Sequence, residues 1–343
     1  MSDRILFSIG EALIDMIPSR VGCSFDEVPA FSPRVGGAPA NVCAAVARLG
    51  GRSALLSQLG DDPFGHKIAR ALAACGVELS HLEFTSKAST ALAFVSLAEN
   101  GERTFSFFRK PSADLLYTPE QIDPVWFSQA FALHFCSVSL VDSPMRYAHL
   151  AAITAAREAG AILSFDPNLR FPLWPDREQL RQTVWQFLPL THILKLSDEE
   201  LPFLTGTEDI EAALPALFTG DVQLVLYTCG SKGASLHPHR QCPRPQPQGN
   251  GGGHHRRGGR LYRLVPVAVA AGRRDHRRAA KAFPQAPDRV SDLFQPLLRY
   301  QRAAPRRHRQ LPHLGTDESG VSPALKANSP HILYFLTFIC YIV

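Results

Sequence analysis

Residues 1–235 predict an α/β fold in which a mostly parallel sheet is flanked by helices. Short apolar runs typical of strands alternate with helical patterns along this part of the chain. Such alternation favours parallel strands joined by helical connections that cover both faces of the sheet. The composition agrees, because 45% apolar and 20% charged residues are ordinary for a globular protein, and 343 residues suffice for one large domain.

The expected elements follow in chain order. Residues 5–9 form a strand-like run, and a helix is expected over 39–49 because Val42, Val46 and Leu49 recur at helical spacing. A second helix is expected over 63–75, with Gly76 as its stop. The pattern then gives strand 131–136, helix 144–159, strand 161–165, helix 177–188, strand 192–196, helix 198–205 and strand 222–228.

Two early segments do not fit this alternation. Residues 88–97 and 103–108 have strand patterns, and Asn100-Gly101 between them is a strong hairpin signal. The stretch 12–31 also lacks a helical pattern. We expect these segments to form a small separate β-layer, a lid built from about 12–35 and 88–110.

The charge distribution divides the chain near residue 235. Residues 1–235 hold 18 Lys+Arg against 26 Asp+Glu, a net of −8, whereas 236–343 hold 18 against 5, a net of +13, and together these give the +5 of the whole chain. Sixteen of the later cations are arginine, and His, Pro and Gly crowd beside them. Such a change predicts a boundary, with residues 236–343 as a largely disordered tail that is not native-like.

Cysteine usage and the chain ends favour a cytoplasmic protein. The seven cysteines are scattered without a C-x-x-C pair, which argues for reduced thiols and against a zinc site. The first residues lack the pattern of a signal peptide. The apolar stretch 331–343 is too short to span a bilayer, so no membrane association is expected.

Polar residues and glycines cluster where the expected parallel strands end. In such sheets, ligands bind beyond the carboxyl ends of the strands. The sequence has no G-x-x-x-x-G-K-[ST] loop and no G-x-G-x-x-G after the first strand, which argues against P-loop nucleotidases and dinucleotide-binding dehydrogenases. The candidate residues at these ends are Asp15, Gly36, Gly37, Asn41, Asp166, Asn168, Arg170, Lys195, Gly230 and Gly233.

An ordered series of short stretches resembles the ribokinase-like (PfkB) carbohydrate kinases, and among them the fructokinases. The resemblance runs from about residue 5 to 234, and the whole series is far more specific than any one stretch. The matching stretches are Gly10-Glu11-Ala12-Leu13-Ile14-Asp15, Gly36-Gly37-Ala38-Pro39-Ala40-Asn41, Leu49-Gly50-Gly51, Gly60-Asp61-Asp62-Pro63-Phe64-Gly65, Pro111-Ser112-Ala113-Asp114, Phe165-Asp166-Pro167-Asn168-Leu169-Arg170 and Lys195-Leu196-Ser197-Asp198-Glu199-Glu200.

The resemblance implies a role for each candidate. Without it, Asp15 could cap a turn, Gly36-Gly37 could be a plain turn, and the arginines could be solvated surface cations. With it, the sugar is expected at Asp15, Gly36, Gly37, Asn41, Arg109, Asp166 and Arg170. The nucleotide is expected at Lys195, Glu200, Thr228, Gly230 and Gly233, with Glu200 acting on Mg²⁺ through water.

The implied reaction is transfer of the γ-phosphoryl group of MgATP to the 6-hydroxyl of D-fructose. K⁺ as a further cofactor and a homodimer through the lid are compatible with the resemblance. Two alternatives stay open: a kinase for another sugar or nucleoside, such as 2-keto-3-deoxygluconate or a riboside, and a sugar-binding protein without catalysis.

The family's Asp-Thr-Thr-Gly-Ala-Gly-Asp segment is missing from the sequence. Suppose that codons 253–263 are read one letter out of frame, so that each new codon takes the last two letters of one codon and the first letter of the next. The eleven new codons can then encode Asp-Thr-Thr-Gly-Ala-Gly-Asp-Ala-Phe-Ile-Gly, in this order. We therefore expect a frameshift between about 235 and 251. Gly259 then stands where the resemblance places the general base, so no catalytic residue is retained and the chain as written is expected to be inactive. The competing interpretation, a basic arm for nucleic acid, leaves this hidden segment a coincidence.

Overall fold

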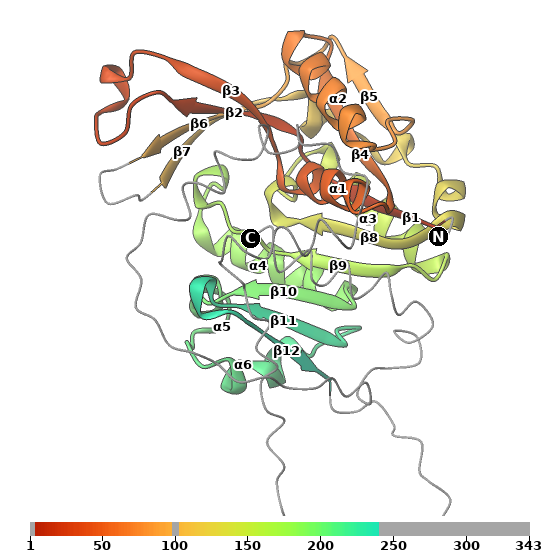
Figure 1. Cartoon of the computed structure of the whole chain (residues 1–343). Coiled ribbons are helices and arrows are strands. Elements are labelled where there is room, and N and C mark those ends of the chain that lie inside the picture. Colours follow the sequence, from red (N-terminus) through yellow and green to blue (C-terminus); the bar gives the residue numbers. More distant parts are fainter. Residues whose placement is uncertain (1–3, 98–102, 240–343) are drawn as a thin grey trace, which may run out of the picture.

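An eight-stranded sheet forms the body of the molecule (Figure 1). The computed structural model describes residues 4–97 and 103–239. The strand order is β12-β11-β10-β9-β8-β1-β4-β5, and every neighbouring pair is parallel except β11 and β12. The strands are β1 (Ile5–Ile9), β4 (Arg52–Gly60), β5 (Leu82–Thr85), β8 (Ala130–Cys136), β9 (Ile162–Asp166), β10 (Ile193–Ser197), β11 (Leu224–Thr228) and β12 (Ala234–Pro238).

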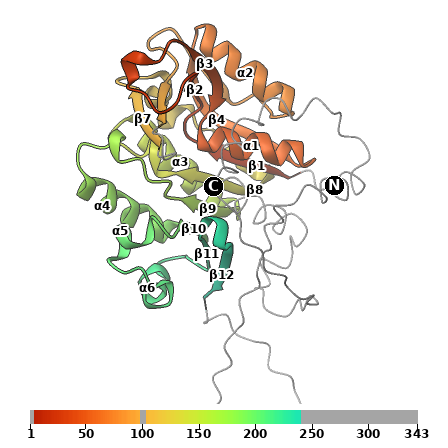
Figure 2. The same cartoon turned by 60° about the vertical axis from the view of Figure 1, so that its left-hand side comes forward.

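Helices cover the sheet unevenly, as Figures 1 and 2 show from two directions. Four of them pack on one face over an apolar core that includes the stacked rings of Phe135 and Phe165, 4.7 Å apart. The other two lie on the opposite side, over β1, β4 and β8. The first group is α3 (Pro144–Glu158), α4 (Arg177–Phe187), α5 (Leu201–Thr205) and α6 (Ile210–Leu217); the second is α1 (Ala38–Arg48) and α2 (Pro63–Cys75).

The α1 side of the sheet is therefore only partly covered by described helices. Among residues 4–97 and 103–239, no helix lies over β9, β10 and β11 on that side (Figures 1 and 2). The side chains pointing there include the apolar Ile193 and Leu226 and the charged Asp166 and Lys195. The predicted α/β fold with a mostly parallel, helix-flanked sheet is confirmed.

The separate β-layer is a four-stranded sheet of order β3-β2-β6-β7. Its central strands β2 and β6 run parallel, while β3 and β7 pair antiparallel with them. Leu97 pairs with Arg103, so the hairpin predicted around Asn100-Gly101 is present, although its tip (98–102) lies outside the described residues. The strands are β2 (Leu13–Pro18), β3 (Phe31–Gly36), β6 (Leu92–Leu97) and β7 (Arg103–Phe108).

The strand expected over 88–97 begins only at Leu92. The reason lies at the start of α2, where the Asp62 carboxylate accepts hydrogen bonds from the backbone N–H groups of Phe64 and Gly65. The same carboxylate accepts bonds from the backbone N–H and the hydroxyl of Thr90, at 2.7 and 3.0 Å. Thr90 is thus held against the helix N-terminus, and the strand begins after it.

The pattern did not predict β4, which lies between β1 and the edge strand β5 and is almost entirely buried. Three polar residues, Ser53, Ser57 and Gln58, interrupt its apolar run. Ser53 donates to the Cys43 carbonyl at 2.7 Å, and Gln58 donates to the Ala113 carbonyl at 2.9 Å. Because these partners come from elsewhere in the chain, sequence periodicity gives no sign that the polar side chains are buried.

The end of the described fold lies close to the expected boundary. Strand β12 pairs with β11 from Ala234 to Pro238, so its ladder crosses residue 235. The strand β12, the helix α6 and the edge strand β5 are further elements that the pattern did not predict. The expected tail from residue 240 onward, with Gly259, lies outside the described residues.

Candidate active site

The carboxyl ends of the parallel strands bring predicted residues together, since Asp166 ends β9 and Thr228 ends β11. Glu11, which follows β1, and Ser139, which follows β8, lie at the same end of the sheet, although the sequence did not single them out. Because β1 leads directly into β2, the lid also leaves the sheet at this edge. The sites expected for the sugar and for the nucleotide therefore share the edge where ligands bind in such folds.

Four of the residues expected to hold the sugar, Asp15, Gly36, Gly37 and Asn41, lie where the lid joins α1. Asp15 lies on β2, and a Cβ atom on Gly36 would come 2.1 Å from its Oδ2, so the carboxylate lies against the glycine. Gly37 has φ +102° and caps α1, where a Cβ would come 2.5 Å from the Glu11 carbonyl. Asn41 follows in the first turn, its N–H bonded to the Gly37 carbonyl at 2.9 Å. Gly37 is therefore required by its backbone conformation and by close contact with backbone atoms, whereas a side chain at Gly36 would displace the Asp15 carboxylate.

Arg170 links the loop after β9 to the lid. Its guanidinium carbon lies 5.6 Å from the centre of the Phe105 ring on β7, within cation–π range. It also donates to the Leu169 carbonyl at 2.9 Å. The side chain is half-buried, so the position expected to close the sugar end sits between the body and the lid.

Asp166, Lys195 and Glu200 form a buried charged cluster next to this loop. Lys195 Nζ lies 3.2 Å from Asp166 Oδ1 and 3.8 Å from Glu200 Oε2. Burial raises the pKa of Asp166 to about 6, although Lys195 opposes the shift. Burial also acts to lower the pKa of Lys195, but the Asp166 and Glu200 carboxylates together outweigh burial, and the pKa is raised. Both groups are therefore ionised at neutral pH.

Glu200 is held by backbone donors on both sides. Its Oε2 accepts from the Ser197 N–H at 2.9 Å, and its Oε1 accepts from the Leu169 N–H at 3.0 Å. Ser197 Oγ in turn accepts from the Glu200 N–H at 3.2 Å, a reciprocal pair at the start of a helix. The S-x-x-E spacing before an apolar run is the sequence signal for this pair. The regular helix expected from 198 begins only at Leu201.

Thr228, Gly230 and Gly233 lie in the turn between β11 and β12. The turn is closed by the Cys229 N–H donating to the Gly233 carbonyl at 2.8 Å, and φ is +50° at Gly230 and +100° at Gly233. The strand order separates this turn from the sugar end by β10, β9 and β8. Its roles as a strand turn and as a nucleotide-binding turn are compatible.

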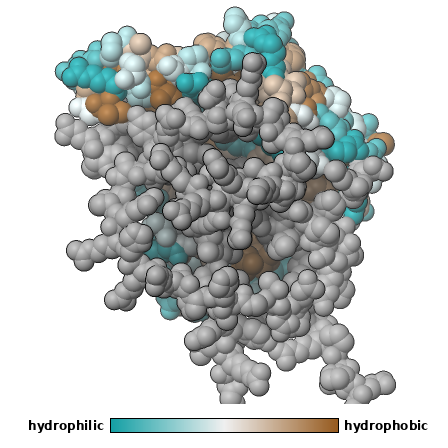
Figure 3. Space-filling view, viewed as in Figure 1, coloured by the Kyte–Doolittle hydropathy of each residue, from teal (hydrophilic) through white to brown (hydrophobic). Residues whose placement is uncertain are grey.

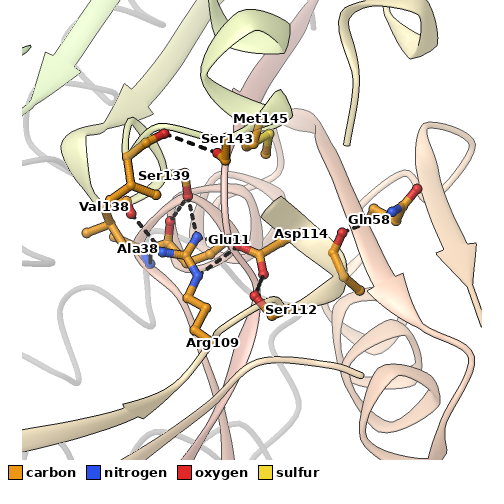
Figure 4. Close-up of polar contacts among 12 residues, drawn as sticks. Glu11, Ala38, Gln58, Arg109, Ser112, Asp114, Val138, Ser139, Ser143 and Met145 are labelled. Carbon is orange, nitrogen blue, oxygen red and sulfur yellow. Dashed lines mark hydrogen bonds and ion pairs between the residues drawn. The ribbon is translucent and has the colours of Figure 1, made fainter. Parts of the chain in front are cut away.

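Arg109 lies deeper than a ligand-facing side chain would suggest. Only 3% of its surface is exposed, and its guanidinium donates to Asp114, Ser139 and the Val138 carbonyl (Figure 4). Sequence reasoning assigned no role to Glu11, Ser139 or Asp114, which share this buried cluster. The signal available for Glu11 and Asp114 was a carboxylate within two quoted stretches, Gly10–Asp15 and Pro111–Asp114.

Neither metal ligands nor membrane spans stand out in the described part of the chain. Residues 4–97 and 103–239 contain no group of three His, Cys, Asp or Glu side chains placed to hold a metal ion. Glu200 alone suits Mg²⁺ only through water, since both its oxygens already accept backbone hydrogen bonds. Over the same ranges, no helix is both long and apolar enough to cross a bilayer.

This architecture, a mostly parallel sheet with a small β-lid at the carboxyl ends of its strands, is shared with a putative ribokinase II from E. coli, 29% identical with a TM-score of 0.63 over 70% of this chain and 77% of that chain. The model of the pfkB family carbohydrate kinases matches residues 4–249. The chain belongs to this family.

Relatives and solved structures agree with the family match. A probable fructokinase-4 from Arabidopsis thaliana is 46% identical over 235 residues, covering 68% of this chain and 72% of that protein. A fructokinase from Xylella fastidiosa with bound ATP is 40% identical with a TM-score of 0.63, covering 68% and 75% of the two chains. A fructokinase double mutant from Vibrio cholerae O395, bound to fructose, ADP and potassium ion, is 38% identical with a TM-score of 0.61, covering 69% and 74%.

Proposed function

We propose that this kinase, in its frame-corrected form, transfers the γ-phosphoryl group of ATP to the 6-hydroxyl of D-fructose. One observation carries the proposal: Asp15 and Gly36-Gly37, where the lid joins α1, and the Asp166–Lys195–Glu200 cluster lie at the same end of the eight-stranded sheet, where its parallel strands end. The relatives named above are fructokinases, and one of their structures holds fructose and ADP together.

The sugar end offers the groups that a polyol needs. The Asp15 carboxylate can accept hydrogen bonds from two hydroxyl groups, and the Asn41 amide can both donate and accept. Because Arg170 lies against the Phe105 ring of the lid strand β7, closure of the lid would change the position of its guanidinium group. Lid closure excludes water and fixes the attacking hydroxyl, which supplies much of the rate in phosphoryl transfer.

The nucleotide end would work with Mg²⁺ carried mainly by the ATP phosphates. Mg²⁺ keeps several waters and few protein carboxylates in such sites, which fits the single, already bonded Glu200. When bound, the ion neutralises charge on the transferred phosphate oxygens. K⁺ stays a proposal, supported by the potassium ion in the Vibrio cholerae structure.

We further propose that the chain as written has little or no kinase activity. Gly259 occupies the position expected for the general base, and glycine cannot accept a proton. Losing a general base costs on the order of 10²–10⁴ in rate. Losing the backbone donors that stabilise the transferred charge costs roughly 10²–10³ more per donor. The frameshift hypothesis accounts for both losses together.

The test compares the chain as written with a protein whose reading frame is corrected after residue 235. Fructose, 2-keto-3-deoxygluconate and a riboside are assayed with both proteins. The proposal expects fructose-dependent ATP turnover in the corrected protein only. Preference for another sugar would move the assignment to that kinase class, and normal turnover by the uncorrected chain would refute the inactivity. Fructose binding without turnover by the uncorrected chain would support a surviving sugar-binding protein. Sequencing of codons 230–265 decides the frame directly.

A cytoplasmic location and a homodimer through the lid complete the proposal. The five cysteines within the described residues are free, which suits a reducing compartment.

The outer lid face carries an aromatic cluster of Phe25, Phe31, Phe94 and Phe108, and Phe25 and Phe108 are 47% and 62% exposed. Figure 3 shows brown apolar side chains on the lid. Such exposed apolar surface suits a second copy of the chain.

Sedimentation of the Phe108→Ser variant tests the homodimer. It should shift a dimer toward monomer, because the change removes apolar surface from the outer lid face. Phe84→Ser, at a residue 40% exposed on the edge strand β5, is the matched control and should not shift it. A wild-type chain that sediments as a monomer at all concentrations would exclude the dimer.

A further inference from the structure

A chain of hydrogen bonds between buried polar groups, called the relay below, runs from the residue that follows lid strand β7 to the start of α1 (Figure 4). The Ala38 N–H donates to Glu11 Oε1 at 3.2 Å, and Ser139 Oγ donates to Glu11 Oε2 at 2.7 Å. Arg109 Nη2 donates to Ser139 Oγ at 2.9 Å and also to Asp114. The four side chains of Glu11, Ser139, Arg109 and Asp114 belong to residues that are at most 3% exposed.

The relay connects elements that are distant in sequence. Ala38 is the first residue of α1 and follows the Gly36-Gly37 turn expected to hold the sugar. Arg109 is the first residue after the lid strand β7. Glu11 and Ser139 follow the body strands β1 and β8. The relay therefore links the end of lid strand β7 to the beginning of α1 by hydrogen bonds that pass through Glu11 and Ser139 of the body.

Arg109 is almost saturated by these contacts. Its Nε and Nη2 donate to Asp114, Nη2 also donates to Ser139, and Nη1 donates to the Val138 carbonyl at 2.7 Å. These bonds to described residues use four of the five N–H groups that a guanidinium has. Only one N–H, on Nη1, is left for a ligand. The orientation of that group is consequently fixed by the protein.

Because the relay contains buried charges that compensate one another, loss of one of its hydrogen bonds should be costly. Burial raises the pKa of Glu11, while Arg109 opposes the shift. Removing one partner of a buried, hydrogen-bonded charge leaves the other partner unsatisfied, which costs far more than an exposed ion pair. The relay can thus transmit a disturbance at one end to the other.

We propose that Glu11, Ser139 and Asp114 are positioning residues that couple the lid strand β7 to the first turn of α1 through Arg109. The lid and the Gly36-Gly37 turn then move as one unit. The part of this inference that concerns sugar affinity rests on the proposed function. The mechanical coupling does not.

Hydrogen exchange in the full-length chain tests the coupling. Asp114 hydrogen-bonds to Arg109 and Ser112 but not to α1. In Asp114→Asn, exchange should nevertheless rise at residues 38–41 as well as at 103–108, by roughly tenfold, the loss expected for one or two hydrogen bonds. Ser139→Ala is the milder variant, which removes one hydroxyl and should give the same pattern. A purely local role would raise exchange at 103–108 alone and would overturn the proposal.

Matched controls and a sugar titration complete the experiment. Ser128→Ala and Glu158→Gln alter exposed side chains outside the relay and should leave exchange at both segments unchanged. If the unmodified chain binds fructose, both relay variants should weaken its affinity about tenfold, as loss of one buried hydrogen bond implies. If the unmodified chain binds no fructose, the proposed substrate fails, while the exchange result still decides the coupling.

Discussion

Lys195 Nζ lies 3.2 Å from Asp166 Oδ1, and the two side chains are 1% and 6% exposed. A buried lysine of this kind is stable only with its counter-charge. We predict that Lys195→Met lowers the free energy of unfolding by about 3–5 kcal/mol, because it removes the buried cation that pairs with Asp166 and Glu200. Urea unfolding followed by circular dichroism measures the change.

The exposed Lys232 provides the matched control. Lys232→Met should change stability by no more than about 0.5 kcal/mol, as is usual for surface substitutions. The double variant Lys195→Met with Asp166→Leu should recover part of the loss, because no buried charge of that pair remains unpaired. Equal stability of Lys195→Met and Lys232→Met would show that Lys195 is not buried as a charged group.

Two buried histidines should make the protein sensitive to mild acid. Burial lowers the pKa of His149 to about 4 and, with the Lys195 charge adding to it, that of His134 to about 3. Both are neutral in the folded state, whereas the unfolded chain binds their protons near pH 6.5. Their contribution to stability is therefore complete above pH 6.5 and is lost as the pH falls toward 4, by up to about 1.4 kcal/mol per pH unit for each histidine.

Unfolding midpoints measured between pH 7 and 4 test this dependence. His149→Gln should reduce the slope by about one proton, because the variant cannot take up a proton on unfolding. His66→Gln, at an exposed side chain paired with Asp61, serves as the control and should leave most of the slope in place. A slope that His149→Gln does not reduce would mean that His149 is already protonated in the folded state.

The alternation of strands and helices was predictable because each helix has one apolar face and each core strand a short apolar run. The lid was predictable from the break in that alternation and from Asn100-Gly101. The strand β4 was not, since Ser53 and Gln58 are buried only because Cys43 and Ala113 supply carbonyl acceptors from elsewhere. Partners that are remote in sequence leave no periodic trace.

The candidate site was predictable as a set of strand ends but not as a network. The positions of Asp15, Asp166 and Lys195 followed from where the apolar runs stop. The relay through Glu11 and Ser139 joins residues 128 positions apart, and only the strand order β8-β1 brings them together. Sequence reasoning treated Arg109 as a ligand-facing cation because neither Asp114 nor Ser139 could be placed against it.

The Asp62 carboxylate should stabilise the fold more than an ordinary helix cap. It accepts hydrogen bonds from two N–H groups of α2 and from the backbone N–H and the hydroxyl of Thr90. Asp209 at the start of α6 accepts, among the described residues, only from the Glu211 N–H. We expect Asp209→Ala to lower the free energy of unfolding by about 1 kcal/mol, as is typical of a cap. Asp62→Ala should lower it by about 2–3 kcal/mol, because two capping hydrogen bonds and the hydrogen bonds to Thr90 are lost. Urea unfolding of both variants compares them, and equal losses would contradict the role of Thr90.

Restoring the expected base alone should not restore kinase activity. Gly259→Asp would place a carboxylate at the position expected for proton acceptance, but the neighbouring residues would still lack the Thr-Thr-Gly-Ala-Gly backbone that would present N–H donors to the transferred phosphoryl group. We expect this variant to stay at background with fructose and MgATP, while the frame-corrected protein turns over. In the corrected protein, glycine in place of the restored aspartate should lower kcat by about 10²–10⁴. Turnover by Gly259→Asp within tenfold of the corrected protein would show that a carboxylate alone completes the site and that the donors come from residues already present.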